Sequence, residues 1–273
     1  MKRALLLSGS LGAGHDVYAK VFESSLTERG WATDTVDAMA LLGRRGGSAG
    51  EAVFRAMLAT PGLYDAFHFA ALRPGSRLAL LADAAAKRQL VPRLRDYLDS
   101  HGADLAISVF ATASSAVSEL ADRYPAMSHV VLCSDVTPHR LWVQPNVDLY
   151  LVTSEAGAAA VRRYQPRARI RVIPALMSAA DLVITSSGDT CAEARVIGRP
   201  LLLLDVVQGH GRDNLQHELE IGGADVVSPR AGDVVRSALA VLDRPPQAPA
   251  GPVRSPADWD AAFGAALADI GLD

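Results

Sequence analysis

The sequence predicts an α/β protein with two lobes, each built on a parallel sheet, and three observations carry this prediction. Short apolar runs alternate with helix-like patterns along the whole chain, which is typical of parallel strands joined by crossover helices. The length of 273 residues suits one large domain or two modest ones. The composition, 49% hydrophobic and 21% charged, is that of a globular protein, and charges interrupt the apolar runs before the roughly 18 residues of a membrane-spanning helix.

The first lobe begins with a buried strand at residues 4–7, which runs into a turn rich in glycine and serine. Val17, Val21, Phe22 and Leu26 then recur at helical spacing until Gly30, so they predict a helix. The remaining strands of this lobe are expected at residues 32–36, 105–109, 130–133, 149–152 and 171–173.

An insertion at residues 41–97 separates the second strand from the third and mixes aromatic residues with arginines. Two interpretations stay open for it. One is a helical face that lies on a membrane surface, and the other is an ordinary packed helical excursion.

The second lobe is predicted to have strands at residues 182–185, 200–206 and 225–227. Helices are expected at about 190–197, 213–221 and 233–242. A proline-rich linker follows at 244–252. Ser255 and Pro256 are typical of the start of a last helix, which we expect to dock on the first lobe. One face of that helix carries Trp259, Phe263, Leu267 and Ile270.

Charge and cysteine content limit the possible environments and partners. Residues 1–175 carry 20 basic and 16 acidic side chains, whereas residues 176–273 carry 7 and 14, which fits two lobes with different partners but also arises by chance. Cys133 and Cys191 form no disulfide framework, so the chain fits a reducing cytoplasm. The histidines show no spacing typical of metal ligands, and we expect no metal site.

The turn at residues 8–15 joins a strand to a helix and would let a phosphate approach the backbone at the helix N-terminus. It does not match a dinucleotide fingerprint, because Val17 stands where GxGxxG needs its last glycine. Asp37 follows the second strand as a ribose-binding acid would, so NAD binding stays an alternative.

His15 stands at the mouth of this turn and is a candidate general base, because histidine side chains titrate near neutral pH. The other interpretation is a residue at a helix N-terminus with no chemical role. A second turn of small residues, 186–190, could hold a diphosphate, with Glu193 accepting hydrogen bonds from a ribose, or could simply be a capped helix start. A polar loop at 208–214 is expected at the same edge of the sheet, where open α/β sheets bind ligands.

Several of these segments occur together in one family of enzymes. Residues 8–15, 134–143, 148–152 and 170–174 resemble the acceptor lobe of monogalactosyldiacylglycerol synthases and processive diacylglycerol glucosyltransferases. Residues 180–185, 188–193 and 198–200 resemble the donor lobe of the same group, which is related to the peptidoglycan N-acetylglucosaminyltransferase.

The resemblance implies two Rossmann-like lobes of the GT-B type. Residues 1–174 would be the N-terminal acceptor-binding lobe and 175–243 the C-terminal lobe that binds a nucleotide sugar. Residues 244–256 would be the linker and 257–273 a helix docking on the first lobe. Because the C-terminal lobe has only 68 residues from Ala175 to Leu242, the first half of the family's donor lobe is expected to be missing.

The function implied is a metal-independent hexosyltransferase of glycolipid biosynthesis, which moves a hexose from a UDP-sugar to a lipid such as diacylglycerol. No cofactor is implied beyond the donor substrate. The expected partners are the nucleotide sugar, the lipid acceptor and the inner face of the cell membrane, with the protein peripheral to it, and no nucleic acid is implied. Two alternatives stay open, namely a binding or regulatory protein that keeps the acceptor lobe, and a sugar-nucleotide epimerase.

The resemblance also implies a role for particular residues. His15 would be the general base, with Asp135 as a second catalytic residue. The acceptor side would be formed by Ser8, Gly9, Gly12, Gly14, His139 and Trp142. The donor side would be formed by Ser187, Gly188, Asp189, Thr190, Glu193, His210 and Asn214.

Overall fold

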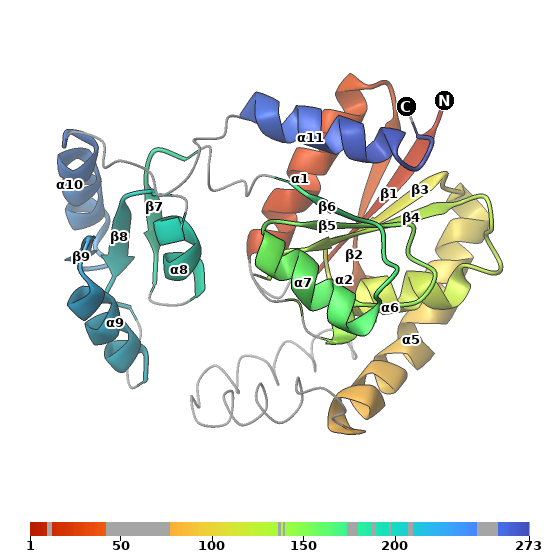
Figure 1. The fold of residues 1–273 in the computed structure, drawn as a ribbon, viewed down its shortest axis with the longest axis horizontal. Coiled ribbons are helices and arrows are strands. Elements are labelled where there is room, and N and C mark those ends of the chain that lie inside the picture. The colour runs from red at the N-terminus through yellow and green to blue at the C-terminus, as the bar shows by residue number, and fades with distance from the viewer. Residues whose placement is uncertain are drawn as a thin grey trace. The chain divides into compact units, whose positions relative to one another are not determined.

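The structure is a computed structural model that describes residues 1–9, 13–41, 77–135, 138, 140–173, 180–186, 189–196, 198–206, 210–244 and 256–272. The chain divides into two compact units, shown in Figure 1. Unit 1 comprises Met1–Ile173 and Ala262–Asp273, and unit 2 comprises Pro174–Ala261. The last helix therefore returns to the unit in which the chain begins.

Unit 1 is built on a six-stranded sheet in which every strand pair is parallel. The strand order is β2-β1-β3-β4-β5-β6, so the chain moves to one side of β1 first and then to the other. This reversal places a topological switch point between β1 and β3. The strands are β1 (Arg3–Ser8), β2 (Ala32–Asp37), β3 (Leu105–Ser108), β4 (Ser128–Cys133), β5 (Leu149–Val152) and β6 (Ile170–Val172).

Helices cover both faces of this sheet, with α1 and α11 on one side and α5, α6 and α7 on the other (Figure 1). One buried cluster joins Leu5, Leu7 and Ala106 to α5 and α6, and a neighbouring one joins Tyr150 and Val152 to α7. The bounds are α1 (Ala13–Glu28), α2 (Ala38–Leu41), α5 (Arg77–His101), α6 (Ala111–Leu120), the short 3-10 helix η1 (Arg140–Trp142), α7 (Glu155–Tyr164) and α11 (Pro256–Ala268).

Helix α11 packs on α1 through aromatic side chains. The rings of Phe22 and Phe263 meet edge to face at 4.9 Å, and both side chains are fully buried. The Arg29 guanidinium lies over the Phe263 ring, 6.0 Å from its centroid. It approaches Gly264 so closely that a Cβ there would be 2.9 Å from one of its nitrogens. A glycine at this position therefore lets the arginine pack between the two helices.

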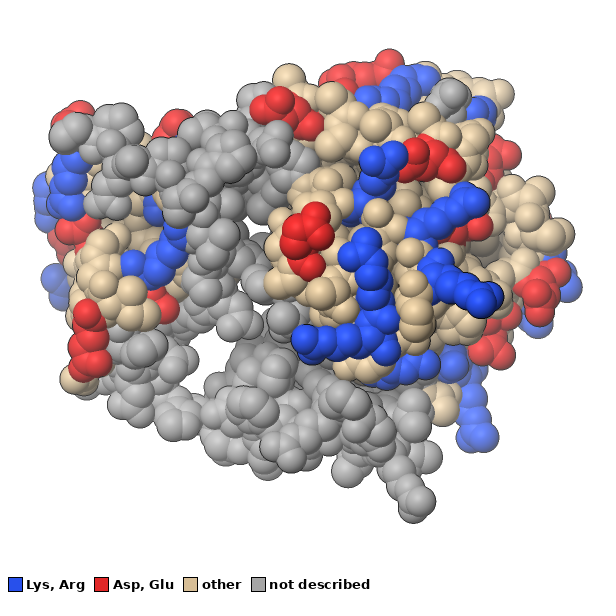
Figure 2. Space-filling view, viewed as in Figure 1, with Lys and Arg blue, Asp and Glu red and all other residues tan. Residues whose placement is uncertain are grey.

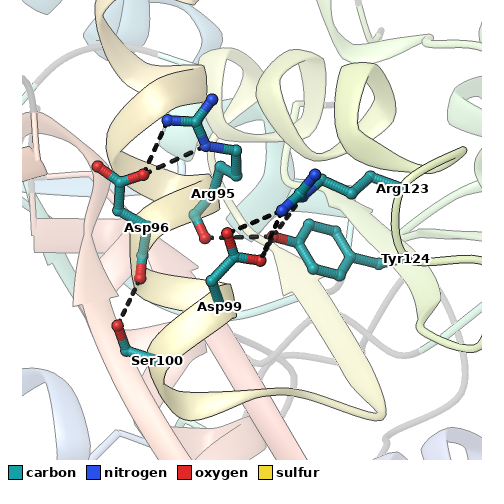
Figure 3. Close-up of polar contacts among 6 residues, drawn as sticks. All are labelled: Arg95, Asp96, Asp99, Ser100, Arg123 and Tyr124. Carbon is teal, nitrogen blue, oxygen red and sulfur yellow. Dashed lines mark hydrogen bonds and ion pairs between the residues drawn. The ribbon is translucent and has the colours of Figure 1, made fainter.

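The C-terminal half of α5 is tied to the connection between α6 and β4 by the polar cluster in Figure 3. The Asp99 carboxylate accepts hydrogen bonds from the Tyr124 hydroxyl at 2.6 Å and from the Arg123 guanidinium at 3.0 Å. These two contacts lower the pKa of Asp99, the tyrosine contact most strongly. The cluster therefore holds the C-terminal end of α5 against the segment that leads into β4.

Unit 2 is built on a smaller parallel sheet of three described strands, β7 (Val183–Thr185), β8 (Leu201–Leu204) and β9 (Ala224–Val227). Its helices are α8 (Asp189–Val196), α9 (His210–Ile221) and α10 (Ala231–Leu242). The strand order follows the chain, so these three strands contain no switch point. A small core of Val183, Leu201, Leu203, Cys191 and Ala194 holds the sheet to α8.

The structure confirms the predicted fold class, two parallel α/β sheets of which the second is the smaller. Two predicted boundaries are wrong. Helix α1 begins at Ala13, within the turn predicted at residues 8–15, so His15 lies in its first turn. The polar loop predicted at 208–214 is helical from His210, because α9 begins there. Most of the predicted insertion, residues 42–76, and the linker at 245–255 lie outside the described residues.

Candidate active site

The candidate acceptor site lies at the carboxyl edge of the sheet of unit 1. There the ends of β1, β3 and β4, which are neighbours in the sheet, present the residues that the sequence singled out. Ligands of open α/β sheets bind at this edge, at the switch point. In this unit the switch point lies between β1 and β3, which are followed by Gly9 and by Val109 respectively.

The end of β1 is closely packed. Ser8 is buried, and its hydroxyl donates a hydrogen bond of 2.6 Å to the Asp16 carboxylate in the first turn of α1. A Cβ at Gly9 would be 2.6 Å from the Phe110 ring, so only glycine fits there. Gly12 lies outside the described residues, and Gly14 lies in the first turn of α1. The two ends of the glycine turn are thus held together, by Ser8 on one side and by Asp16 on the other.

His15 links the ends of the two strands on either side of the switch point, β1 and β3. Its Nδ1 lies 2.6 Å from the carbonyl oxygen of Val109, which follows β3. A carbonyl can only accept, so Nδ1 carries the hydrogen, and in the neutral ring Nε2 then holds the free lone pair. The ring meets that of Phe110 edge to face at 5.4 Å and lies 6.5 Å from that of Trp142. The imidazole is therefore held in the form that a general base requires.

Asp135 and Trp142 form the other wall of the site. Trp142 is buried, and its indole Nε1 donates a hydrogen bond of 2.8 Å to Asp135 Oδ2. Because the same indole lies beside the His15 ring, the structure brings His15, Trp142 and Asp135 together. His139, a predicted acceptor residue on the same connection, lies outside the described residues.

Cys133 ends β4 two residues before Asp135 and is fully buried. Burial, with a smaller contribution from the Asp135 charge, raises the pKa of this thiol. A thiol that stays protonated is a poor nucleophile. We therefore assign no nucleophilic role to Cys133.

Sequence reasoning missed three residues of this site, namely Asp16, Val109 and Phe110. Asp16 anchors the glycine turn, Val109 accepts the hydrogen bond from His15, and Phe110 packs against its ring. The signal for the last two was their place directly after β3, at the edge where the other candidate residues gather. A backbone carbonyl carries no sequence signature, so the role of Val109 required the structure.

The described part of the predicted donor side comprises the two helices that follow β7 and β8 in unit 2. Helix α8 follows β7 and helix α9 follows β8, so both helices begin at the same edge of a parallel sheet. Thr190 is half-buried in the first turn of α8. Ser187 and Gly188 lie outside the described residues, as do the side chains of Asp189, Glu193, His210 and Asn214, whose backbones are helical.

Polar contacts that the sequence did not predict join α8 and α9, the two helices that carry predicted donor residues. The Arg195 guanidinium of α8 forms an ion pair of 2.9 Å with Glu218 of α9 and also donates to the Gly222 carbonyl. Both side chains of the pair are mostly buried, which strengthens such a contact relative to one on the surface. The contact therefore joins the C-terminal ends of the two helices, away from the helix starts that carry the predicted donor residues.

The described part of the chain contains neither a metal-binding cluster nor a membrane-spanning helix. No group of three or more histidine, cysteine, aspartate or glutamate side chains is placed there to hold a metal ion. None of the described helices has the length and apolar character needed to cross a membrane.

One family model matches part of unit 1. Residues 72–171 match the family model of monogalactosyldiacylglycerol (MGDG) synthase. The matched segment includes all of α5, ends in β6 and contains Val109, Phe110, Asp135 and Trp142. The match confirms the predicted resemblance to this family of glycosyltransferases.

Comparisons with solved structures give distant likenesses only. Sucrose-phosphate synthase from Thermosynechococcus elongatus has a TM-score of 0.45 and 14% identity, over 84% of this chain and 70% of that one. HepE from Anabaena, in complex with UDP and glucose, has a TM-score of 0.40 and 13% identity, over 85% and 70%. MurG from Acinetobacter baumannii has a TM-score of 0.36 and 11% identity, over 89% and 91%. Likenesses at this level assign neither a ligand nor an activity to this chain.

Among curated proteins, no sequence gives a significant match to the chain.

Proposed function

We propose that the protein is a hexosyltransferase that moves a sugar from a nucleotide donor, of the UDP class, to a hydroxyl of a lipid acceptor such as diacylglycerol. The observation that carries the proposal is the hydrogen bond from His15 Nδ1 to the Val109 carbonyl, which leaves Nε2 as a base at the switch point. Val109, Phe110, Asp135 and Trp142 belong to the segment that matches the MGDG synthase family, whereas His15 precedes that segment.

In the proposed reaction, His15 Nε2 removes the proton from the acceptor hydroxyl while the hydroxyl oxygen attacks the anomeric carbon of the sugar. The bond from that carbon to the diphosphate breaks, and the nucleoside diphosphate leaves with the electron pair. Asp135, held by Trp142, would stabilise the imidazolium that forms or orient the acceptor. Each role depends on side chains at the carboxyl edge of unit 1.

The donor would bind at the starts of α8 and α9 in unit 2. The free N–H groups and the positive dipole end of a helix favour phosphate, and they would stabilise the charge that builds up on the leaving diphosphate. Glu193 would accept hydrogen bonds from the ribose, with Ser187, Gly188, Asp189 and Thr190 near the phosphates and His210 and Asn214 near the sugar. The reaction as proposed needs no cofactor and no metal ion.

A basic surface on unit 1 supports the proposal that the protein works at the inner face of a membrane. Figure 2 shows Lys and Arg side chains gathered on the face of unit 1 that carries α7 in Figure 1. Exposed arginines follow one another from the end of α7 into β6, at positions Arg162, Arg163, Arg167, Arg169 and Arg171. Basic side chains near an anionic membrane surface contribute about 1 kcal/mol each to binding.

The test is a transfer assay with radiolabelled UDP-glucose and UDP-galactose and diacylglycerol in vesicles, using the wild-type protein and His15→Asn. We expect the wild type to form glycolipid and the variant to lose about 10²- to 10⁴-fold in kcat, which is the usual contribution of a general base. His101→Asn is the matched control, since His101 lies at the end of α5 and its side chain bonds to the Tyr97 carbonyl one turn earlier in the same helix.

The assay tests two claims separately, namely the transfer activity and the role of His15 as the base. If the wild type forms no glycolipid from either donor, the proposed function is wrong. If the wild type is active and His15→Asn keeps its rate, transfer occurs but the base is another residue.

A second candidate function is favoured by the short sheet of unit 2. Its three described strands follow chain order and lack the reversal at which doubly wound domains bind nucleotides. The protein could then be a binding or regulatory protein that keeps the acceptor unit and performs no transfer. Nucleotide binding distinguishes the two functions, because the transferase must bind UDP and the binding or regulatory protein need not.

A further inference from the structure

Phe110 occupies an unusual position for an aromatic residue. It is the N-cap of α6, with extended backbone angles (φ −140°, ψ 130°), and no side chain caps this helix start. Serine, threonine, aspartate and asparagine are strongly preferred at such positions because their oxygens bond to the free N–H groups. Phenylalanine has no oxygen that could accept such a bond, so any stabilisation it provides must come from the packing of its ring.

The Phe110 ring fills the space between the end of β1 and His15. On one side, three of its ring carbons would lie 2.6 to 2.9 Å from a Cβ at Gly9, so it presses directly on the glycine backbone. On another side, it packs on the buried cluster that includes Leu5 and Leu7. Its edge-to-face contact with the imidazole has an interplanar angle of 72°. The ring is thus fixed by β1 and by the core while it contacts His15.

The hydrogen bond to Val109 and the contact with Phe110 constrain His15 in different ways. The carbonyl selects which nitrogen carries the hydrogen, but a single hydrogen bond leaves the imidazole free to swing about it. The neighbouring aromatic edge limits that swing, because only a narrow range of ring planes keeps both contacts. The two residues are adjacent in sequence, so one short segment after β3 supplies both.

We propose that Phe110 is a positioning residue that holds the His15 ring against the Val109 carbonyl, so that Nε2 is kept as the basic nitrogen. The catalytic part of this inference rests on the proposed function, whereas the tautomer of His15 can be measured without any substrate. Phe110 acts through His15 and contacts no reacting atom in this scheme.

The experiment is long-range ¹⁵N–¹H correlation spectroscopy at pH 8 on protein with ¹⁵N-labelled histidine. The protein has seven histidines, and His15→Asn assigns the signal of interest by its loss. We expect the wild type to show a single Nδ1–H tautomer at His15. Phe110→Leu should show a mixture with the Nε2–H form, which free histidine side chains favour, and Phe110→Tyr should keep the wild-type pattern.

Phe22→Leu is the matched control, because Phe22 also makes an edge-to-face aromatic pair in unit 1, with Phe263, and does not contact His15 in this way. It should destabilise unit 1 and leave the His15 tautomer unchanged. If Phe110→Leu folds and keeps a pure Nδ1–H tautomer, the inference is overturned. If Phe110→Leu does not fold, the His15 tautomer is measured in Phe110→Met instead, and a pure Nδ1–H tautomer in that variant overturns the inference.

The kinetic readout separates this inference from the proposed function. In an active wild type, Phe110→Leu should lower kcat roughly 10-fold with little change in KM for the nucleotide sugar, because the base is misplaced and donor binding is not. A wild type without transfer activity would refute the proposed function, and the tautomer measurement would still decide the role of Phe110.

Discussion

Two histidines of unit 1 have opposite surroundings. His15 is half-buried at the carboxyl edge and bonds to a backbone carbonyl. His129, in β4, is only 2% exposed, and its Nε2 lies 3.1 Å from the Ser108 hydroxyl. Burial lowers the pKa of His129 to about 3, because a charged imidazole would lose its hydration. His129 therefore stays neutral in the core, whereas His15 lies at the edge of the sheet where the proposed acceptor would bind.

The buried His129 predicts a loss of stability in mild acid. The unfolded chain takes up a proton at this residue below about pH 6.5, whereas the folded protein does so only near pH 3. Stability from the neutral ring is therefore complete above pH 6.5 and falls by up to about 1.4 kcal/mol per pH unit below it. At pH 5 the expected loss is about 2 kcal/mol relative to pH 7.5. The free energy of unfolding at the two pH values is measured by urea titration, followed by tryptophan fluorescence.

The variant His129→Leu removes this titration and should show a smaller loss between pH 7.5 and pH 5. His101→Leu, at an exposed position, is the control and should behave as the wild type. Equal pH dependence in His129→Leu and the wild type would contradict the prediction.

At the scale of elements, α7 packs small residues on the sheet and carries exposed charged residues at both of its ends. It packs on the sheet through small residues, Gly157, Ala158 and Ala160, together with Val161. Small side chains bring the helix axis close to the sheet and leave the long side chains to point outward. Ser154 caps its start by accepting a hydrogen bond from the Gly157 amide at 3.0 Å. Its end then leads directly into the arginines that flank β6.

The arginines at the end of α7 predict binding to anionic vesicles. The triple variant Arg162→Glu, Arg163→Glu, Arg167→Glu should bind vesicles with 30% phosphatidylglycerol at least about 100-fold more weakly than the wild type, since each basic residue contributes about 1 kcal/mol. Co-sedimentation measures the binding. Raising the salt concentration should weaken wild-type binding, because screening shortens the range of the attraction.

The matched control carries the same change in charge on another helix, with Arg88→Glu, Arg93→Glu and Arg95→Glu on α5, all exposed. If this control loses as much binding as the α7 variant, net charge and not this surface is responsible. If both variants bind like the wild type, the basic surface has no role at the membrane.

At the scale of the whole molecule, the sequence was sufficient for the order of elements and not for the contacts of the site. Apolar runs and helical spacing located every strand of both sheets to within a few residues, because buried parallel strands leave a clear pattern. His15 could be named from its place at the glycine-rich turn, and Asp135 and Trp142 from a resemblance. Their mutual arrangement depends on a backbone carbonyl and an aromatic N-cap, which no local pattern encodes. The loop predicted at 208–214 was wrong at its helical end because Gly209 and Gly211 suggest a turn.

Isothermal titration with UDP distinguishes the two proposed functions. A transferase should bind UDP with a Kd between micromolar and millimolar, and Glu193→Ala should weaken binding about 10-fold, or 1.4 kcal/mol, if the ribose contacts this carboxylate. Glu220→Ala is the control, since Glu220 is exposed on α9 and contacts Gln216. Absence of binding at millimolar UDP, together with binding to vesicles, would favour the binding or regulatory protein.

The docking of α11 on α1 also constrains how the chain can fold during synthesis. Phe22 emerges from the ribosome about 240 residues before Phe263, its ring partner. Domains generally fold as units while the chain is being made, in order from the N-terminus. Here the first unit to be translated stays incomplete until after the second, so the apolar side of α1 remains uncovered through most of translation. A nascent chain stalled before residue 260 should therefore expose a surface that chaperones bind.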